Sequence, residues 1–397
     1  MSDKRIKTNK KMMILSFLGI IIVVLGHTGD SFKLASDFFP YYSFHMALFI
    51  FISGYFYNPK NEEKIFGKDG YTVRKIRKMI VPYFIWNLIY GIIVNILKNM
   101  NIVQFGEKIT IKSFFYRPWT TGHQYILNIA AWFILALFLV NITYIIIRKI
   151  STKLKIWNDD VFTIIYLILS IAMVYLAQKN KSENYIPFLR TTFFMFFYQL
   201  GYWYKVRIEG KIKINTFIYF LILIIIQLIL FKVDGKLTYE VVFMKFGCKY
   251  IITPIISSIT GILFWLKISE ILEPILGENK IVNYISNNTY DIMQHHLFWM
   301  FLINFTIFCL TTVFDLNGFN TSRFKSTIYY AYTFGVSQVQ IIYTIICIVM
   351  PISVRYIYEK TTDKIKEILI LRKNNRIEEN KLKKVKEPEN LGAVHTH

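Results

Sequence analysis

Apolar runs of membrane-spanning length recur along this chain of 397 residues, and they constrain its fold more than any other feature. A run of roughly 20 apolar residues matches the hydrocarbon core of a bilayer. Hydrophobic residues make up 54% of the sequence, which is more apolar surface than a soluble core would bury. In lipid, a helix satisfies its own backbone hydrogen bonds. The sequence therefore predicts an all-α, polytopic integral membrane protein.

The apolar runs predict about ten transmembrane helices, which form one domain over residues 1–357. A basic cytosolic tail over 358–397 should begin as a short amphipathic helix on the membrane surface and then fray. We assign no role to His395 and His397 in that tail. The first run follows a basic start, but no small-residue cleavage pattern follows it, so we interpret it as an uncleaved span. The expected spans are 12–28, 39–57, 79–97, 126–147, 161–177, 188–204, 214–231, 248–266, 290–314 and 336–357.

The formal charge of +22 is concentrated in alternate connections and at both termini. In a soluble protein it would point to nucleic acid, but here it indicates positive-inside topology and contact with anionic lipid, with no nucleic-acid partner. Both termini should therefore be cytosolic. The eighth connection is ambiguous, because Lys267 and Lys280 are offset by Glu270, Glu273 and Glu278.

Two histidines lie near the outer ends of adjoining spans. If the first span enters the membrane at Met12, His27 lies about 22 Å along it. The second span enters from the opposite side near Phe39, so His45 lies about 9 Å from the same edge. The two imidazoles can share one depth. Asp30 is a candidate to orient His27, or else a hydrated loop residue.

A neutral imidazole at such a depth can accept a proton from a hydroxyl and later return it. The alternative is a buried histidine satisfied by a backbone carbonyl or a serine. For one intramembrane histidine we favour that alternative, and for two at matching depth we favour function.

A third imidazole cluster, His295-His296, should lie about 8 Å from the cytosolic edge, at the other end of the bundle. Neighbouring residues on a helix point about 100° apart, so at most one faces a given cavity. Metal sites on helices use i,i+4 spacing and further ligands, so no metal is expected. The cysteines Cys248, Cys309 and Cys347 fall in apolar runs and are interpreted as core residues.

A basic segment precedes Pro82 at the cytosolic start of the third span. Its four cations could hold the phosphates of a cytosolic donor, or they could only anchor the helix to anionic lipid. They are Arg74, Lys75, Arg77 and Lys78.

The outward connection over about 98–125 is long and contains Arg117, Trp119 and His123. Long loops in compact proteins are often binding loops, and a poorly packed connector is an equally good interpretation. Arg190, near the outer start of the sixth span, is a lone cation without an assigned partner.

Several separated stretches, in this order and spacing, resemble the acyltransferase-3 family of membrane O-acyltransferases. The family's usual layout also has ten spans. The stretches are "FLGIIIVVLGH" ending at His27, "FHMALFIFISGYFY" from Phe44, "RKIRKMIVPYFIW" from Arg74, "AAWFILALFLV" from Ala130, "FYQLGYWYK" from Phe197 and "SNNTYDIMQHHLFW" from Ser286.

The resemblance implies that His27 is catalytic. The family carries a basic residue eleven positions before that histidine, where this chain has Ser16, and Lys10 or Lys11 could replace it. The family also has proline where this chain has Ala47. Acetyl-CoA is the implied acyl donor. Its phosphates would dock at the basic segment, and we also place His296 among the donor-binding residues.

We therefore expect a multi-pass enzyme of a bacterial plasma membrane. It would transfer an acyl group, acetyl in the first instance, from cytosolic acyl-CoA to a hydroxyl of a cell-surface or exported polysaccharide. The proposed catalytic residues are His27, His45 and Asp30. Some family members carry an extracellular esterase-like domain, so a separate extracytoplasmic enzyme could serve as partner here. The alternatives are a transporter or flippase of a glycan without covalent chemistry, and a membrane receptor for a cell-wall enzyme.

Overall fold

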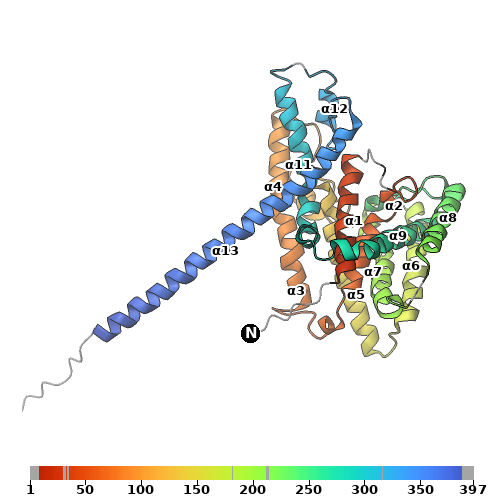
Figure 1. Ribbon diagram of the computed structural model, residues 1–397, viewed down its shortest axis with the longest axis horizontal. Helices are drawn as coiled ribbons and strands as arrows, with labels where there is room; N and C mark the ends of the chain where they lie inside the picture. The colour runs from red at the N-terminus through yellow and green to blue at the C-terminus, as the bar shows by residue number, and fades with distance from the viewer. Residues whose placement is uncertain are drawn as a thin grey trace, which may run out of the picture.

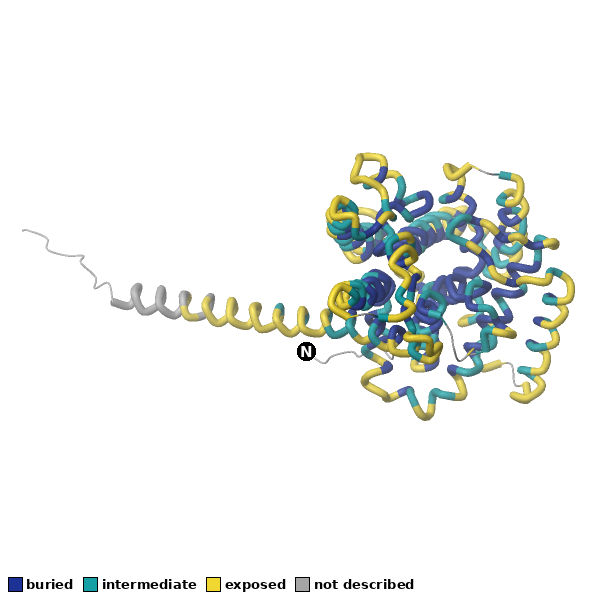
Figure 2. Tube along the Cα trace, turned by 90° about the horizontal axis from the view of Figure 1, so that it is seen from above, coloured by how far each residue is buried: buried dark blue, intermediate teal, exposed yellow. Residues whose placement is uncertain are grey.

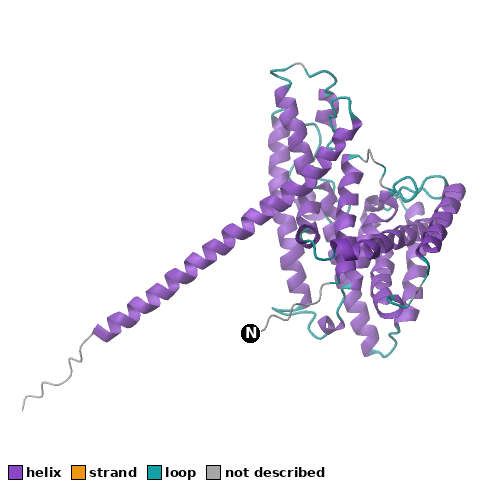
Figure 3. Ribbon diagram, viewed as in Figure 1, coloured by secondary structure: helices purple, strands orange, loops and turns teal. Residues whose placement is uncertain are grey.

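Helices build the whole bundle in this computed structural model, which describes residues 9–29, 33, 35–180, 182–211, 214–314 and 316–386. Within those ranges the strand-like pairing is one isolated bridge between Glu240 and Lys245, which confirms the all-α prediction (Figure 3). The α-helices are α1 (Lys10–Thr28), α2 (Tyr41–Tyr55), α3 (Tyr71–Lys75), α4 (Val81–Asn99), α5 (Trp132–Lys153), α6 (Asp159–Lys179), α7 (Ile186–Trp203), α8 (Thr216–Asp234), α9 (Thr253–Leu276), α10 (Lys280–Asn287), α11 (Thr289–Leu310), α12 (Thr321–Ser326) and α13 (Gln340–Lys386).

Eight helical segments are long and apolar enough to cross a membrane, and they match eight of the predicted spans. α1 lies in the middle of the bundle, with α4 and α11 on one side and α6 to α8 on the other (Figure 1). The outer helices expose apolar side chains while the interior is buried (Figure 2). On α8 the exposed apolar residues include Phe217, Leu221, Ile225 and Leu228. This face suits contact with lipid tails.

The other two predicted spans are α2 and α7, which pack closely against each other inside the bundle. Two glycines permit this approach. A Cβ on Gly54 would lie 1.9 Å from the carbonyl oxygen of Tyr198, and one on Gly201 would lie 2.0 Å from that of Phe51. Small residues at such crossings allow helix backbones to meet in membranes. The two glycines therefore explain why "SGYF" and "QLGYW" occur in these helices.

Alternate connections gather at the same end of the bundle, as the charge pattern predicts. At one end, Lys10 pairs with Glu278 and Lys11 with Glu209 at 2.7 Å, so the N-terminus, the sixth connection and the eighth connection meet there. The ambiguous eighth connection is thus at the N-terminal end. At the opposite end, the amide of Gln104 donates to the carbonyl of Lys325 at 2.8 Å, which joins the third and ninth connections.

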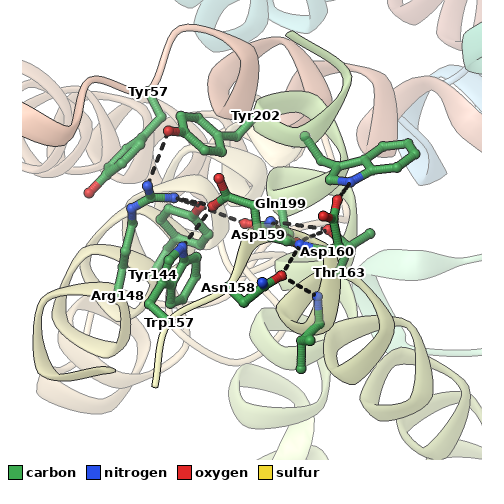
Figure 4. A network of polar contacts seen from close by, with 12 residues as sticks. Tyr57, Tyr144, Arg148, Trp157, Asn158, Asp159, Asp160, Thr163, Gln199 and Tyr202 are labelled. Atoms are coloured by element: carbon green, nitrogen blue, oxygen red, sulfur yellow. Dashed lines mark hydrogen bonds and ion pairs between the residues drawn. The ribbon is translucent and has the colours of Figure 1, made fainter. Parts of the chain in front are cut away.

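A fully paired cation fixes the N-terminal end where α5 leads into α6 (Figure 4). The guanidinium of Arg148 forms ion pairs with Glu62 at 3.0 Å and Asp159 at 3.2 Å. It also donates to the hydroxyls of Tyr144 and Tyr202 at 3.2 and 3.1 Å. We call these five residues the Arg148 network. A buried charge is tolerated only when its partners are present, so the network ties four segments of the chain together.

The last helix corrects the prediction for the tail. α13 runs for 47 residues to Lys386 and projects away from the bundle, instead of ending near 357 and giving way to a short surface helix (Figure 1). Pro351 lies inside it without ending it. The residues that follow are mostly Lys, Glu, Ile, Leu and Arg, which favour helix, and no Gly or Pro occurs among them before Pro388. His395 and His397 lie outside the described residues.

Candidate functional site

A cavity of about 510 Å³ lies in the bundle and is lined largely by apolar groups. Both histidines of the opening spans line it. His27 comes from the last turn of α1 and His45 from the first half of α2. The ring of Tyr42 is near both, with centroids 6.2 Å from His27 and 5.1 Å from His45. The two imidazoles therefore share one cavity, and their common depth in a membrane stays a prediction.

The hydrogen bonds of the imidazoles assign their protons. Nδ1 of His27 donates to the carbonyl of Val23 at 2.8 Å, and Nδ1 of His45 donates to the carbonyl of Tyr41 at 2.5 Å. In each case Nδ1 is the protonated nitrogen, so Nε2 carries the lone pair. Within the described residues, no hydrogen bond engages Nε2 of His27. That atom can accept a proton from a bound molecule.

His296 lies against His27, which corrects its predicted place at the other end of the bundle. The ring centroids are 5.0 Å apart, and Nε2 of His296 is 3.4 Å from Nδ1 of His27. The estimate counted helix rise from an assumed entry point of this span. Contacts between helices decide its place instead: α10, just before α11, packs Val282 against Met13 and Ile14 of α1, and α11 itself packs against α1.

His296 lies in a position that can orient His27, the role that we predict for Asp30. Asp30 lies outside the described residues, so its role stays a prediction. Nδ1 of His296 donates to the carbonyl of Ile292 at 2.8 Å, so its Nε2 carries a lone pair. That lone pair lies 3.4 Å from Nδ1 of His27, whose proton is donated to the closer carbonyl of Val23. His296 is fully buried. The pair fixes the ring of His27 from the side away from its free Nε2. The position of His296 separates it from the cytosolic cations with which we had grouped it.

Sequence reasoning missed two tyrosines of this cavity. The ring of Tyr329 stacks on His27 at 5.8 Å between centroids and 14° between planes. The hydroxyl of Tyr42 donates to the carbonyl of Gly26 at 2.9 Å. Tyr329 comes from the loop after α12, and nothing in its sequence surroundings marks it as part of a site. The i,i+3 spacing of Tyr42 and His45 on α2 is a signal that could have identified Tyr42.

Two loops form the wall of the cavity at the end opposite the N-terminus, and Arg190 of α7 holds both. Its guanidinium donates to the carbonyl of Val242 at 2.9 Å and to that of Trp119 at 3.2 Å. It also lies 4.8 Å from the ring centroid of Trp132, which lines the cavity. Arg190 is 1% exposed, and no ion pair reaches it from the described carboxylates. Arg190, for which the sequence suggested no partner, is therefore a buried residue that joins the two loops beside the cavity.

His123 shows that the long loop after α4 is a packed wall and not a loose connector. Its ring meets that of Phe243 edge to face at 4.6 Å, so the two loops touch across the cavity. Burial lowers the pKa of His123 to about 4, and the positive charge of Arg190 adds to the effect. His123 is therefore neutral at physiological pH. Arg117 anchors the same loop to Glu183 by an ion pair at 2.5 Å.

The basic segment spans α3 and a π-helical turn, Ile76–Ile80, before α4. Pro82 has no N–H to bond the carbonyl of Lys78, which explains the wider turn at this point. Arg74 is engaged by the carbonyl of Asp69, and the ammonium of Lys75 lies over the ring of Tyr71. Within the described residues, the other two cations, Arg77 and Lys78, are exposed and form no ion pair.

The lysines that could replace the basic residue at position 16 are engaged elsewhere. Lys10 and Lys11 pair with the carboxylates of Glu278 and Glu209. Ser16 itself is buried on α1. Among the described residues, no group of three His, Cys, Asp or Glu side chains could hold a metal ion.

The long apolar helices define a polytopic membrane protein, and a buried histidine pair lies beside its cavity. Comparison with known families agrees with that class, because the model of the acyltransferase domain matches residues 14–343. The chain belongs to the acyltransferase-3 family. No curated protein and no solved structure matches it significantly.

Proposed function

We propose that this enzyme transfers an acetyl group from cytosolic acetyl-CoA to a hydroxyl of a surface or exported polysaccharide. The observation that carries the proposal is the free Nε2 of His27 in a cavity, with Nδ1 fixed by Val23 and His296. That arrangement suits a general base. The family supplies acyl transfer as the reaction class.

In the proposed reaction, Nε2 of His27 takes the proton of the acceptor hydroxyl as its oxygen attacks the thioester carbon. The carbon–oxygen bond of the new ester forms and the carbon–sulfur bond breaks. The CoA thiolate then takes the proton from His27 and leaves as the thiol. His296 packs against His27 throughout, with its Nε2 3.4 Å from Nδ1 of His27, while the Nδ1–H itself donates to the carbonyl of Val23. His45 lines the same cavity and would contact one of the reactants there.

The donor and the acceptor would enter from opposite ends of the bundle. Arg77 and Lys78 are exposed at the N-terminal end, which the charge pattern assigns to the cytosol, and their charges suit the phosphates of CoA. The wall held by Arg190 lies at the other end. A polysaccharide outside the cell would meet the cavity there, and the aromatic rings of Tyr329, Trp132 and Phe243 suit the apolar faces of sugars.

The experiment uses purified protein in vesicles with acetyl-CoA labelled in the acetyl group and a surface glycan from the native cell. We expect label to pass into the glycan as a base-labile ester. Movement of unlabelled glycan across the vesicle without incorporation of label would identify a transporter instead and overturn the proposal. Label in the glycan with acetyl-CoA, but not with succinyl-CoA, would assign the acyl group.

A further inference from the structure

Three amide side chains are buried beside the histidines with part of their hydrogen-bonding capacity unused. The unpaired atoms are Nδ2 of Asn87, Oε1 of Gln124, and both Nε2 and Oε1 of Gln294. Asn87 is 0% exposed, and Gln124 and Gln294 are each 1% exposed. Buried polar groups are nearly always paired, so unpaired ones call for an explanation. Among the described residues, Gln294 is the one amide unpaired at both ends.

Asn87 on α4 and Gln294 on α11 each adjoin the contact between these two helices, where the ring of Trp86 meets that of His295. Nε2 of Gln124 donates to Oδ1 of Asn87 at 2.9 Å, which joins two of them. Gln294 precedes His295, whose Nδ1 lies 2.6 Å from the hydroxyl of Tyr90. The ring of His295 also meets Trp86, the neighbour of Asn87, at 4.4 Å.

The contact of α4 with α11 lies between the basic segment and the catalytic histidine. The hydroxyl of Tyr290 donates to the carbonyl of Met79 at 3.1 Å, directly after the basic segment. Gln294 is one helical turn further along α11, about 6 Å, on the same face as Tyr290. Its neighbour Met293 lines the cavity, and His296 contacts His27. A donor held by its phosphates at the basic segment must pass this contact to bring a thioester to His27.

We propose that Asn87, Gln124 and Gln294 bind the amide groups of the pantetheine arm of acyl-CoA. That arm contains two secondary amides, which together offer two N–H donors and two carbonyl acceptors. The protein offers two unpaired donor atoms, Nδ2 of Asn87 and Nε2 of Gln294, and two unpaired acceptor atoms, Oε1 of Gln124 and Oε1 of Gln294. The two sets complement each other. This assignment rests on the proposed function, because it specifies how that donor is held.

The test compares Gln294→Leu with the wild type in detergent or vesicles. Leucine is apolar and of similar size, so the variant buries no unpaired amide atom and its thermal midpoint should not fall. The KM for acetyl-CoA should rise about tenfold to hundredfold, since hydrogen bonds to the arm are lost. The dissociation constant for adenosine 3′,5′-bisphosphate, which carries phosphates but no arm, should stay the same.

Gln227→Leu is the matched control. Gln227 is also fully buried and also has an unpaired Oε1, but it lies on α8 and donates to Thr260 at 2.6 Å. We expect no change in the KM for acetyl-CoA in this variant.

An unchanged KM in Gln294→Leu, or a lowered thermal midpoint with an unchanged KM, would show that the amides serve the fold or hold water, and would overturn the assignment. An equal loss of affinity for adenosine bisphosphate would also contradict it. Failure of the wild-type protein to bind CoA at all would instead reject the proposed function, so the two failures are distinguishable.

Discussion

Two buried polar clusters in the bundle differ in how completely their atoms are paired. In the Arg148 network, one guanidinium meets two carboxylates and two phenols. Figure 4 shows the carboxylate of Asp159 and the hydroxyl of Tyr202 beside it. Around the cavity, His27 keeps a free Nε2, and Arg190 has two carbonyls and an aromatic face instead of a carboxylate. Gln294, next to the cavity-lining Met293, has no side-chain hydrogen bond. A paired cluster stabilises the fold, whereas unpaired groups are costly unless a ligand uses them. We therefore expect the Arg148 network to serve the fold and the groups at the cavity to serve the reaction.

The largest expected effect tests the groups at the cavity. His27→Gln keeps a polar side chain of similar size but removes the basic nitrogen. We expect acetyl transfer to fall by about 10³-fold, within the range for loss of a general base, with the thermal midpoint almost unchanged. Steady-state assays with labelled acetyl-CoA measure the rate. Near-normal transfer by this variant would remove His27 from the mechanism.

The next largest effect tests the Arg148 network. Arg148→Met leaves Glu62 and Asp159 without their cation in a poorly solvated place. We expect a loss of about 3 kcal/mol in the free energy of unfolding, because breaking a buried pair strands its partner. Thermal melting in detergent measures it. The rate per folded molecule should remain normal, and a selective loss of rate would place this network in the mechanism.

The smallest effect concerns Arg190, which lies beside the cavity but also holds two loops in place. Arg190→Lys keeps the charge, but one ammonium does not reproduce the planar fork that serves the carbonyls of Val242 and Trp119. We expect the KM for the glycan to rise about tenfold while the KM for acetyl-CoA is unchanged. A change confined to acetyl-CoA would show that this wall faces the donor.

The sequence was sufficient wherever the answer depended on one helix at a time. Spans followed from hydrophobicity, and helix rise along α1 and α2 predicted that His27 and His45 could come together, as they do in one cavity. Prediction from the sequence failed where the position of a residue depended on contacts between helices. His296 was misplaced because contacts of α10 and α11 with α1 decide its position.

Other contacts of the site join residues that are distant in the sequence, so no single segment predicts them. Arg190 joins loops that are far apart in the sequence, and Tyr329 reaches His27 from the loop after α12. The long tail was misjudged for a different reason. Its charge and lack of aromatic residues indicated fraying, but its helix-forming residues continue α13 to Lys386.

The most direct test of the account measures stability and rate together in His27→Gln and Arg148→Met. The account predicts opposite outcomes: transfer lost with the thermal midpoint kept in the first variant, and the midpoint lowered with transfer per folded molecule kept in the second. A His27→Gln protein that unfolds early but still transfers acetyl would contradict the claim that pairing separates function from structure in this bundle.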